Sequence, residues 1–231
     1  MEINNNAIVT GASSGIGYAI AQMLASKGYK VYGIGRSFED KCDFEKIVCD
    51  LSDSKQLTDT IEKIRNEASI GVLVNCAGVG YYGLHEEIKP CNISELVRVN
   101  LEAPMVITNL LLKDIKANEG YIINISSVTA NEVNTHGCAY GATKAGLTSF
   151  THSLFAEVRK HNVKVVNIQP DMTDTKLYRN ADFTCDDAAE AHLTPQEIAD
   201  AVAYVLEQRE GMLVTDIVLK PQKHRIAKKS R

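Results

Sequence analysis

The sequence lacks any apolar run that approaches the ~20 residues a membrane-spanning helix needs. Its first six residues have neither the basic region nor the apolar stretch of a secretory signal. It also lacks an excess of positive charge, because the formal net charge is −4 and nucleic acid usually demands a basic face. These absences predict a cytoplasmic protein that binds neither a membrane nor nucleic acid.

Signals for disulfides and metal sites are missing as well. The six cysteines have no Cys-x-x-Cys spacing, and the six histidines show no metal-ligand spacing. We therefore expect reduced thiols and no metal. The chain is 45% hydrophobic and 23% charged, which is typical of globular proteins, and 231 residues suffice for one large core. The sequence predicts a single domain over residues 1–231.

The C-terminal residues are strongly basic, although the chain as a whole has a net charge of −4. Its cations are Lys220, Lys223, Arg225, Lys228, Lys229 and Arg231, and no aromatic residue stands among them for stacking on bases. A solvated or assembly-docking tail at about 222–231 is the prediction. Binding to an anionic partner is the alternative.

Apolar runs alternate with longer helical stretches, which is the pattern of parallel βαβ units. Strands are expected at 7–10, 30–34, 46–48, 72–75, 121–125, 164–168 and 213–219. Helices are expected at 15–27, 54–66, 92–112, 139–160 and 194–207, the last with a capping-box sequence at its start. With right-handed crossovers, this predicts an α/β fold with a doubly wound, seven-stranded parallel sheet, helices on both faces and binding sites at the carboxyl ends of the strands.

A glycine-rich turn follows the first expected strand in Thr10-Gly-Ala-Ser-Ser-Gly-Ile-Gly17. A strand, such a turn and a helix in this order place backbone N–H groups and the positive end of a helix dipole where a pyrophosphate can bind. Gly11 would allow the tight turn, Gly15 the approach to phosphates, and Gly17 close packing of helix on strand. We therefore prefer a dinucleotide site to an ordinary loop with three glycines.

Tyr140 and Lys144 stand four residues apart, and Ser127 ends an apolar run upstream of them. Positions i and i+4 share one face of a helix, so the ammonium would lie beside the phenol and lower its pKa. Taken alone, the pair is more often a half-buried tyrosine beside a snorkelling lysine. The rest of the sequence favours a proton donor.

Five segments together resemble the short-chain dehydrogenase/reductase family in order and spacing. They are the turn at 10–17, Asn75-Cys-Ala-Gly78, Asn100, Ser127 and Tyr140-Gly-Ala-Thr-Lys144, and with the strand and helix pattern they cover the chain to about residue 219. The resemblance implies a Rossmann-type fold and an NAD or NADP cofactor. It also implies hydride transfer between the nicotinamide and a small carbonyl or alcohol substrate, and assembly as a homodimer or homotetramer.

The end of the second strand predicts NADP. Rossmann-type NAD sites carry an acidic residue there, whereas NADP sites place an arginine against the 2′-phosphate. Gly35 fills the position of the acid and Arg36 follows it. A surface arginine in a polar loop is the alternative. The expected cofactor-binding residues are Gly11, Ser13, Ser14, Gly15, Ile16, Gly17, Arg36, Ser37, Asp50, Leu51, Asn75, Ala77, Gly78, Tyr140, Lys144, Pro170, Thr173 and Thr175.

The resemblance also implies four catalytic residues. Tyr140 would donate a proton to the carbonyl oxygen, and Ser127 would hold that oxygen. Lys144 would hold the nicotinamide ribose and make Tyr140 more acidic. Asn100 would support a water that leads protons to the lysine, and a buried asparagine at a helix kink is a compatible structural alternative.

Asp171 replaces the glycine that the family carries after Pro170, and glycine permits backbone angles that aspartate tolerates poorly. Residues 171–193 correspond to the family's variable substrate loop, with Tyr81 and Tyr82 expected in the same pocket. The loop's acids would disfavour anionic ligands, or they simply form a solvated face; they are Asp174, Asp182, Asp186, Asp187 and Glu190. We expect a small neutral or cationic carbonyl compound or alcohol.

Other functions stay open. A non-catalytic dinucleotide-sensing or scaffold protein could share the fold, although such proteins commonly lose the tyrosine or the lysine. A NAD-preferring alcohol dehydrogenase would share the chemistry. A sugar-nucleotide epimerase or dehydratase would need a larger C-terminal domain, for which the residues after the last expected strand leave no room.

Overall fold

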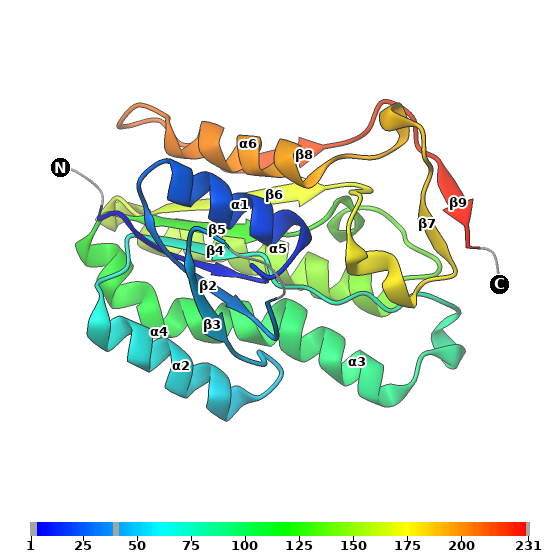
Figure 1. The fold of residues 1–231 in the computed structure, drawn as a ribbon, viewed down its shortest axis with the longest axis horizontal. Coiled ribbons are helices and arrows are strands. Elements are labelled where there is room, and N and C mark those ends of the chain that lie inside the picture. The colour runs from blue at the N-terminus through cyan, green and yellow to red at the C-terminus, as the bar shows by residue number, and fades with distance from the viewer. Residues whose placement is uncertain (1–3, 39–41, 230–231) are drawn as a thin grey trace.

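A parallel seven-stranded sheet forms the centre of the protein in a computed structural model that describes residues 4–38 and 42–229 (Figure 1). Its strand order is β3-β2-β1-β4-β5-β6-β8. The strands are β1 (Asn6–Thr10), β2 (Lys30–Gly35), β3 (Glu45–Val48), β4 (Val72–Asn75), β5 (Tyr121–Ile125), β6 (Lys164–Pro170) and β8 (Asp216–Leu219). The chain moves outward from β1 in one direction and then from β4 in the other, so a crevice is expected at the carboxyl ends of these two strands.

Helices cover both faces of the sheet, as predicted for a Rossmann-type fold. The helices α1 (Gly15–Ser26) and α6 (Pro195–Leu206) pack on one face, where Leu24 and Val202 join a core with Val9. On the other face lie α2 (Ser54–Glu67), α4 (Ala103–Ala117) and α5 (Cys138–Val158), whose apolar residues pack with Leu73. Figure 1 shows α1 and α6 above the sheet and α2 and α4 below it. The inner strands β4 and β5 are buried on both faces and are mostly apolar, with one asparagine in each, Asn75 and Asn124.

Local sequence signals account for where two of these helices begin. The Asp53 carboxylate accepts hydrogen bonds from the N–H groups of Lys55 and Gln56 at the start of α2. At α6, the Thr194 hydroxyl accepts from the Glu197 N–H, and the Glu197 carboxylate accepts from the Thr194 N–H at 2.6 Å. The predicted capping box is therefore confirmed. Within the described residues, none of the helices combines the length and apolar character needed to cross a membrane.

The expected helix at 92–112 is instead three consecutive elements. It begins earlier as α3 (Pro90–Val97), passes through a π-helical turn (Arg98–Glu102), and continues as α4 to Ala117. The wider turn carries Asn100, whose side chain is buried and paired with the backbone of Val79. Such a turn is not visible as a change of hydrophobic period, and π-turns frequently mark functional sites.

A second, two-stranded sheet was not predicted. The strands β7 (Phe183–Cys185) and β9 (Ile226–Lys228) pair antiparallel, and they bring the basic C-terminal segment onto the loop after β6 (Figure 1). The Lys223 ammonium lies 2.8 Å from the Glu190 carboxylate, and the Lys229 ammonium donates to the Tyr178 carbonyl at 2.6 Å. The described part of the tail is therefore not a free solvated segment, because the chain's own loop holds it.

Candidate active site

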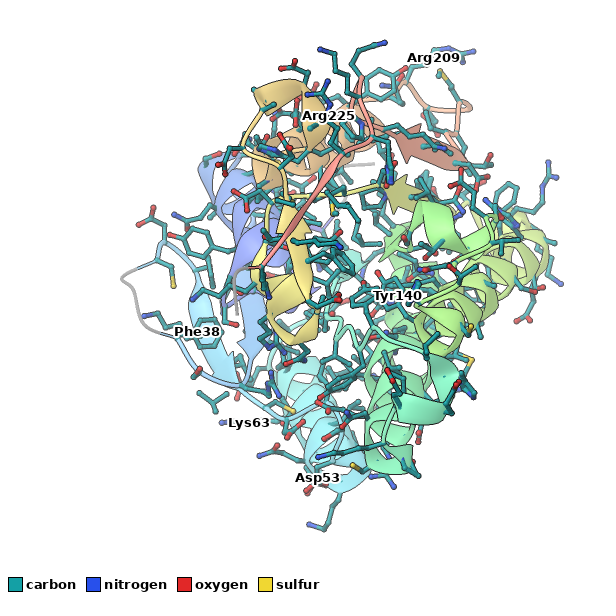
Figure 2. The ribbon with its side chains drawn as sticks, turned by 90° about the vertical axis from the view of Figure 1, so that its right-hand side faces the viewer. Phe38, Asp53, Lys63, Tyr140, Arg209 and Arg225 are labelled. Atoms are coloured by element: carbon teal, nitrogen blue, oxygen red, sulfur yellow. The ribbon has the colours of Figure 1, made fainter. Side chains whose placement is uncertain are left out.

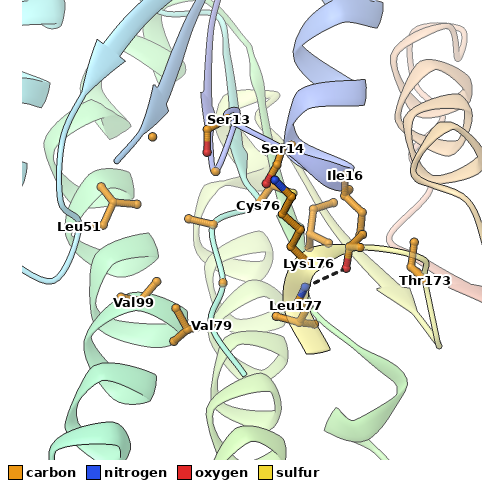
Figure 3. A pocket seen from close by; sticks show the side chains of 18 of the residues that line it. Ser13, Ser14, Ile16, Leu51, Cys76, Val79, Val99, Thr173, Lys176 and Leu177 are labelled. Atoms are coloured by element: carbon orange, nitrogen blue, oxygen red, sulfur yellow. Dashed lines mark hydrogen bonds between the residues drawn. The ribbon is translucent and has the colours of Figure 1, made fainter. Parts of the chain in front are cut away.

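A cavity opens at the carboxyl ends of the central strands, where the strand order reverses. Its wall contains every predicted site residue except Ser37, Asn75 and Asn100. Figure 2 looks onto this end of the sheet, with Tyr140 near its centre, and Figure 3 shows the part of the wall around the glycine-rich turn. The fold thus brings together predicted residues from seven separate segments of the sequence.

The glycine-rich turn has the tight packing that the sequence predicts. A Cβ on Gly17 would lie 2.3 Å from the Gly11 carbonyl oxygen, so only glycine lets α1 approach the end of β1 this closely. Gly11 and Gly15 adopt φ of +71° and +55°, which favour glycine. The Ser14 hydroxyl makes no capping bond to α1, so the first N–H groups of this helix face the cavity without a side-chain partner.

The segment after β4 is fastened to this turn. The Thr10 hydroxyl oxygen accepts hydrogen bonds from the N–H groups of Cys76 and Ala77, both at 3.0 Å. Ala77 and Gly78 consequently line the cavity, as predicted. Asn75 does not, because its buried amide donates to Asn124 on β5 at 2.8 Å. Its side chain therefore ties two strands together inside the protein, and a contact of Asn75 with the cofactor stays a prediction.

Arg36 reaches the cavity from the end of β2. Its guanidinium lies 3.8 Å from the Glu95 carboxylate and is more than half exposed. The pKa of Asp50 is lowered chiefly by a hydrogen bond from the Ser52 N–H, and the charge of Arg36 lowers it further by a smaller amount. A Cβ on Gly35 would lie 2.9 Å from Cβ of Ser13, so an acidic side chain does not fit at this position without a shift. Ser37 is exposed and lies outside the cavity wall.

Ser127 presents its hydroxyl proton toward the interior of the site. Its Oγ accepts from both the N–H and the hydroxyl of Thr129, at 3.2 and 3.0 Å. Because these two bonds use both lone pairs of the oxygen, the proton of Ser127 is available to another acceptor. That acceptor is Tyr140, whose oxygen interacts with the Ser127 hydroxyl.

Tyr140 and Lys144 share one face of α5, as the spacing predicts. Both are buried, with the Lys144 ammonium 5.8 Å from the centre of the Tyr140 ring and donating to the Ile125 carbonyl at 2.9 Å. The expected lowering of the tyrosine pKa is not what the structure produces. Burial raises the pKa of Tyr140 to about 12, against the lowering effects of hydrogen bonds from Ser127 and Tyr82. Burial also lowers the pKa of Lys144 to about 8.

Asn100 lies next to the site and not in the cavity wall. Its Oδ1 accepts from the Val79 N–H at 2.9 Å, and its Nδ2 donates to the Val79 carbonyl at 3.0 Å. The side chain thus pairs with the loop after β4 as a neighbouring strand would. A Cβ on Gly78 would touch both Asn100 Oδ1 and the Lys144 ammonium at 3.6 and 3.9 Å, so the two polar groups flank this glycine. The structure therefore contains the structural role that the sequence left open for Asn100, a buried asparagine at an irregular turn of a helix.

The loop after β6 adds cations that the sequence analysis did not single out. Lys176 and Arg179 line the cavity, and Figure 3 shows Lys176 extending toward Ser14 at the glycine-rich turn. Of the loop's acidic residues, Asp171 lies in the cavity wall and the others do not. In the sequence, the one feature that pointed to these cations was their position just after Thr175. The loop was interpreted from its acidic residues, which are more numerous.

Asp171 is accommodated without backbone strain. It does not have a positive φ, and its carboxylate accepts from the Met172 N–H at 2.8 Å and lies 3.8 Å from the imidazole of His224 in the C-terminal segment. The concern that aspartate would tolerate the glycine's backbone angles poorly is therefore not borne out at this position.

Three aromatic side chains cover Tyr140 on the side of the substrate loop. The Tyr82 ring lies 5.5 Å from the Tyr140 ring and 5.2 Å from Phe183 of β7, and Tyr178 completes the cluster. This cover leaves Tyr140 only 5% exposed. Tyr82 therefore contacts Tyr140 directly, whereas the hydroxyl of its neighbour Tyr81 turns away to Glu95.

The sequence pattern of the short chain dehydrogenase family matches residues 5–185, and the chain belongs to this family of oxidoreductases. An uncharacterized oxidoreductase of Staphylococcus saprophyticus is 31% identical, with 93% of this chain and 96% of that protein covered. A metagenomic short-chain oxidoreductase in complex with NADP is 31% identical with a TM-score of 0.80, covering 95% and 98%. A 3-ketoacyl-(acyl-carrier-protein) reductase from Brucella melitensis, complexed with NADH, has the same fold at 24% identity, a TM-score of 0.81, and coverage of 92% and 96%.

Proposed function

We propose that the protein is an NADP-dependent oxidoreductase that transfers a hydride between the nicotinamide and a small carbonyl or alcohol substrate, with Tyr140 as the proton donor. One observation carries the proposal: a single cavity has the glycine-rich turn and Arg36 at one end and Ser127, Tyr140 and Lys144 at the other. A dinucleotide carries phosphates at one place and a reactive nicotinamide ring at another. The glycine-rich turn and Arg36 are complementary to the phosphates, and Ser127, Tyr140 and Lys144 are complementary to the reacting end.

The residues present fit such a cofactor. Gly11, Gly15 and Gly17 leave backbone N–H groups without covering side chains, and Lys176 adds a cation beside Ser14. Arg36 would meet the 2′-phosphate, while Gly35 leaves no space for the acid that binds a ribose hydroxyl in NAD sites. The NADP complex of the metagenomic relative supports this choice, and the NADH complex of the Brucella reductase shows that the fold alone does not dictate it.

Bound cofactor supplies the hydride, and the chain's own residues manage the proton and the substrate oxygen. Because burial keeps the pKa of Tyr140 near 12, the phenol is protonated at neutral pH and ready to donate. Ser127, with its lone pairs occupied by Thr129, would donate a hydrogen bond to the same substrate oxygen. In this protonation state Tyr140 can act as the proton donor for carbonyl reduction near pH 7.

The proposal is tested by mixing the protein with NADPH and a panel of aldehydes, ketones, keto acids and quinones. We expect loss of the NADPH absorbance with at least one carbonyl compound, and slower loss with NADH. Binding of NADPH without turnover of any member would instead support the sensor or scaffold alternative. A retained cofactor without net oxidation would support an epimerase.

Replacing Arg36 with Leu is expected to lower kcat/KM for NADPH by about 100-fold and to change the value for NADH by less than about 3-fold. Two charge-assisted hydrogen bonds to a phosphate account for a loss of this size, and NADH carries no 2′-phosphate. Arg209→Leu is the matched control, because Arg209 lies outside the cavity wall. Equal losses with the two cofactors would contradict a 2′-phosphate role.

We also propose that the chain acts as one cytoplasmic domain and assembles as a homodimer or homotetramer, with residues 1–231 folding as a unit. The half-exposed apolar side chains Tyr204 on α6 and Val218 on β8 support an assembly surface at this edge. Light scattering of the purified protein at micromolar concentration should give a mass two or four times that of the chain. A monomeric mass at that concentration would contradict the assembly.

A further inference from the structure

Tyr82 is the one aromatic residue of the cover that exchanges a hydrogen bond with Tyr140. The two rings lie 5.5 Å apart, and their hydroxyls interact. Because Tyr140 gives its own proton to the substrate in the proposed reaction, the proton between the two hydroxyls must come from Tyr82. Burial holds the pKa of Tyr82 well above its ordinary value, which keeps this hydroxyl protonated across the working range of pH.

The surroundings fix the ring of Tyr82 in this position. A Cβ on Gly80 would lie 2.7 Å from Cε2 of Tyr82, so the ring lies directly on the glycine backbone. On its other sides stand Phe183 and Tyr178, with ring centres at 5.2 and 6.0 Å. Asn180 of the substrate loop donates to the Gly80 carbonyl at 3.3 Å and ties the loop to this segment. Tyr82 is therefore pre-positioned, with little freedom to turn its hydroxyl elsewhere.

A negative charge develops on Tyr140 when it gives up its proton, and few groups are placed to stabilise it. Ser127 is expected to turn its proton to the substrate oxygen. Lys144 attracts this charge from a distance, because its ammonium is 5.8 Å from the centre of the Tyr140 ring and donates its hydrogen bond to the Ile125 carbonyl. The other titratable groups near the phenol are Cys76 after β4 and Tyr178 of the substrate loop, and neither lowers the pKa of Tyr140.

We propose that Tyr82 is a positioning residue that donates its hydroxyl proton to the Tyr140 oxygen and stabilises the phenolate formed when Tyr140 protonates the substrate. The inference rests on the proposed function and adds a residue outside the five segments that carry the family resemblance in the sequence. It also explains why the aromatic cover lies on Tyr140: Phe183 and Tyr178 hold the donor in place from the substrate loop.

The test is Tyr82→Phe, which keeps the ring and removes only the donor. A lost hydrogen bond to a charged group predicts a roughly 10- to 100-fold lower kcat for carbonyl reduction, with KM changed less than about 2-fold. For alcohol oxidation, the rise in rate with pH should move to higher pH, because the pKa of Tyr140 rises when the donor is gone. A lower kcat with an unchanged pH profile would overturn the proposal.

Tyr81→Phe is the matched control, because the Tyr81 hydroxyl donates to Glu95 at 2.6 Å and not to Tyr140. It should leave the pH profile of oxidation where it is. Gly80→Ala tests the same contact without removing a hydroxyl, since the new methyl group displaces the Tyr82 ring, and it should move the profile in the same direction as Tyr82→Phe. A shift with Tyr81→Phe as large as that with Tyr82→Phe would count against the proposal.

A readout without turnover separates this inference from the proposed function. In protein labelled with ¹³C at Cζ of tyrosine, the Tyr140 resonance is assigned from its loss in Tyr140→Phe, and it should shift in Tyr82→Phe and stay in place in Tyr81→Phe. A Tyr140 resonance that does not respond to Tyr82→Phe overturns the inference whether or not the enzyme is active. Failure of the wild-type protein to oxidise NADPH with any carbonyl compound overturns the proposed function instead.

Discussion

Replacing Tyr140 with Phe should reduce kcat for carbonyl reduction about 1,000-fold and leave the affinity for NADPH almost unchanged. The phenol is the group at the catalytic end of the cavity that is protonated at neutral pH and contacts the Ser127 hydroxyl. A positioned general acid contributes on the order of 10²–10⁴ in rate. The ring itself stays, so the packing with Val79, Leu96 and Val99 is retained. Stopped-flow measurement of NADPH oxidation and a fluorescence titration of NADPH give the two quantities.

Tyr204→Phe provides the matched control, because Tyr204 is half exposed on α6 and lies outside the cavity wall. It should retain the wild-type kcat. If Tyr140→Phe kept more than about a tenth of the wild-type rate, its contribution would be below that of a general acid, and the proton would have to come from elsewhere. Loss of NADPH binding together with the rate would instead make Tyr140 a cofactor-binding residue.

The parts of the fold that follow from short stretches of sequence were predicted well. Most strands of the central sheet contain an apolar run, and the capping box and the contact of Gly17 with Gly11 depend on neighbours close in the chain. The predicted strand at 213–219 begins only at Asp216, because strand pairing to β6 and not the apolar character of Leu213 and Val214 determines where it starts. Local patterns identify elements more reliably than their ends.

The parts that were missed depend on contacts between distant segments. The strands β7 and β9 are three residues long and more than 40 positions apart, so neither carries a periodic pattern. The pKa of Tyr140 was predicted from its helix neighbour Lys144, yet burial has the larger effect, and the aromatic residues that help to cover Tyr140 come from distant segments. Asn75 and Asn100 were placed by resemblance, which does not reveal that their side chains pair with Asn124 and with the backbone of Val79. Burial and pairing of this kind arise only when the chain has folded.

Lys144→Met is expected to abolish most activity and, at the same time, to stabilise the folded protein at neutral pH. The ammonium is 4% exposed and its pKa is lowered to about 8, so the folded protein carries the cost of burying a charge below that pH. A lowering from 10.5 to about 8 corresponds to about 3 kcal/mol. Loss of the hydrogen bond to Ile125 offsets about 1 kcal/mol of this, so we expect a net gain of about 2 kcal/mol at pH 7.

The lowered pKa of Lys144 also predicts how the stability difference between Lys144→Met and the wild type changes with pH. Between pH 8 and 10.5 the unfolded chain holds the lysine proton and the folded chain does not, so the wild-type free energy of unfolding rises with pH over this window. Methionine has no proton to lose, and the advantage of the variant should therefore shrink from pH 7 to pH 10 in urea unfolding experiments. Lys63→Met on the exposed face of α2 is the control and should show no such trend. A variant that is less stable than the wild type at pH 7 would mean that the ammonium contributes more to the fold through Ile125 than its burial costs, and that this lysine has a structural role in addition to the catalytic one proposed.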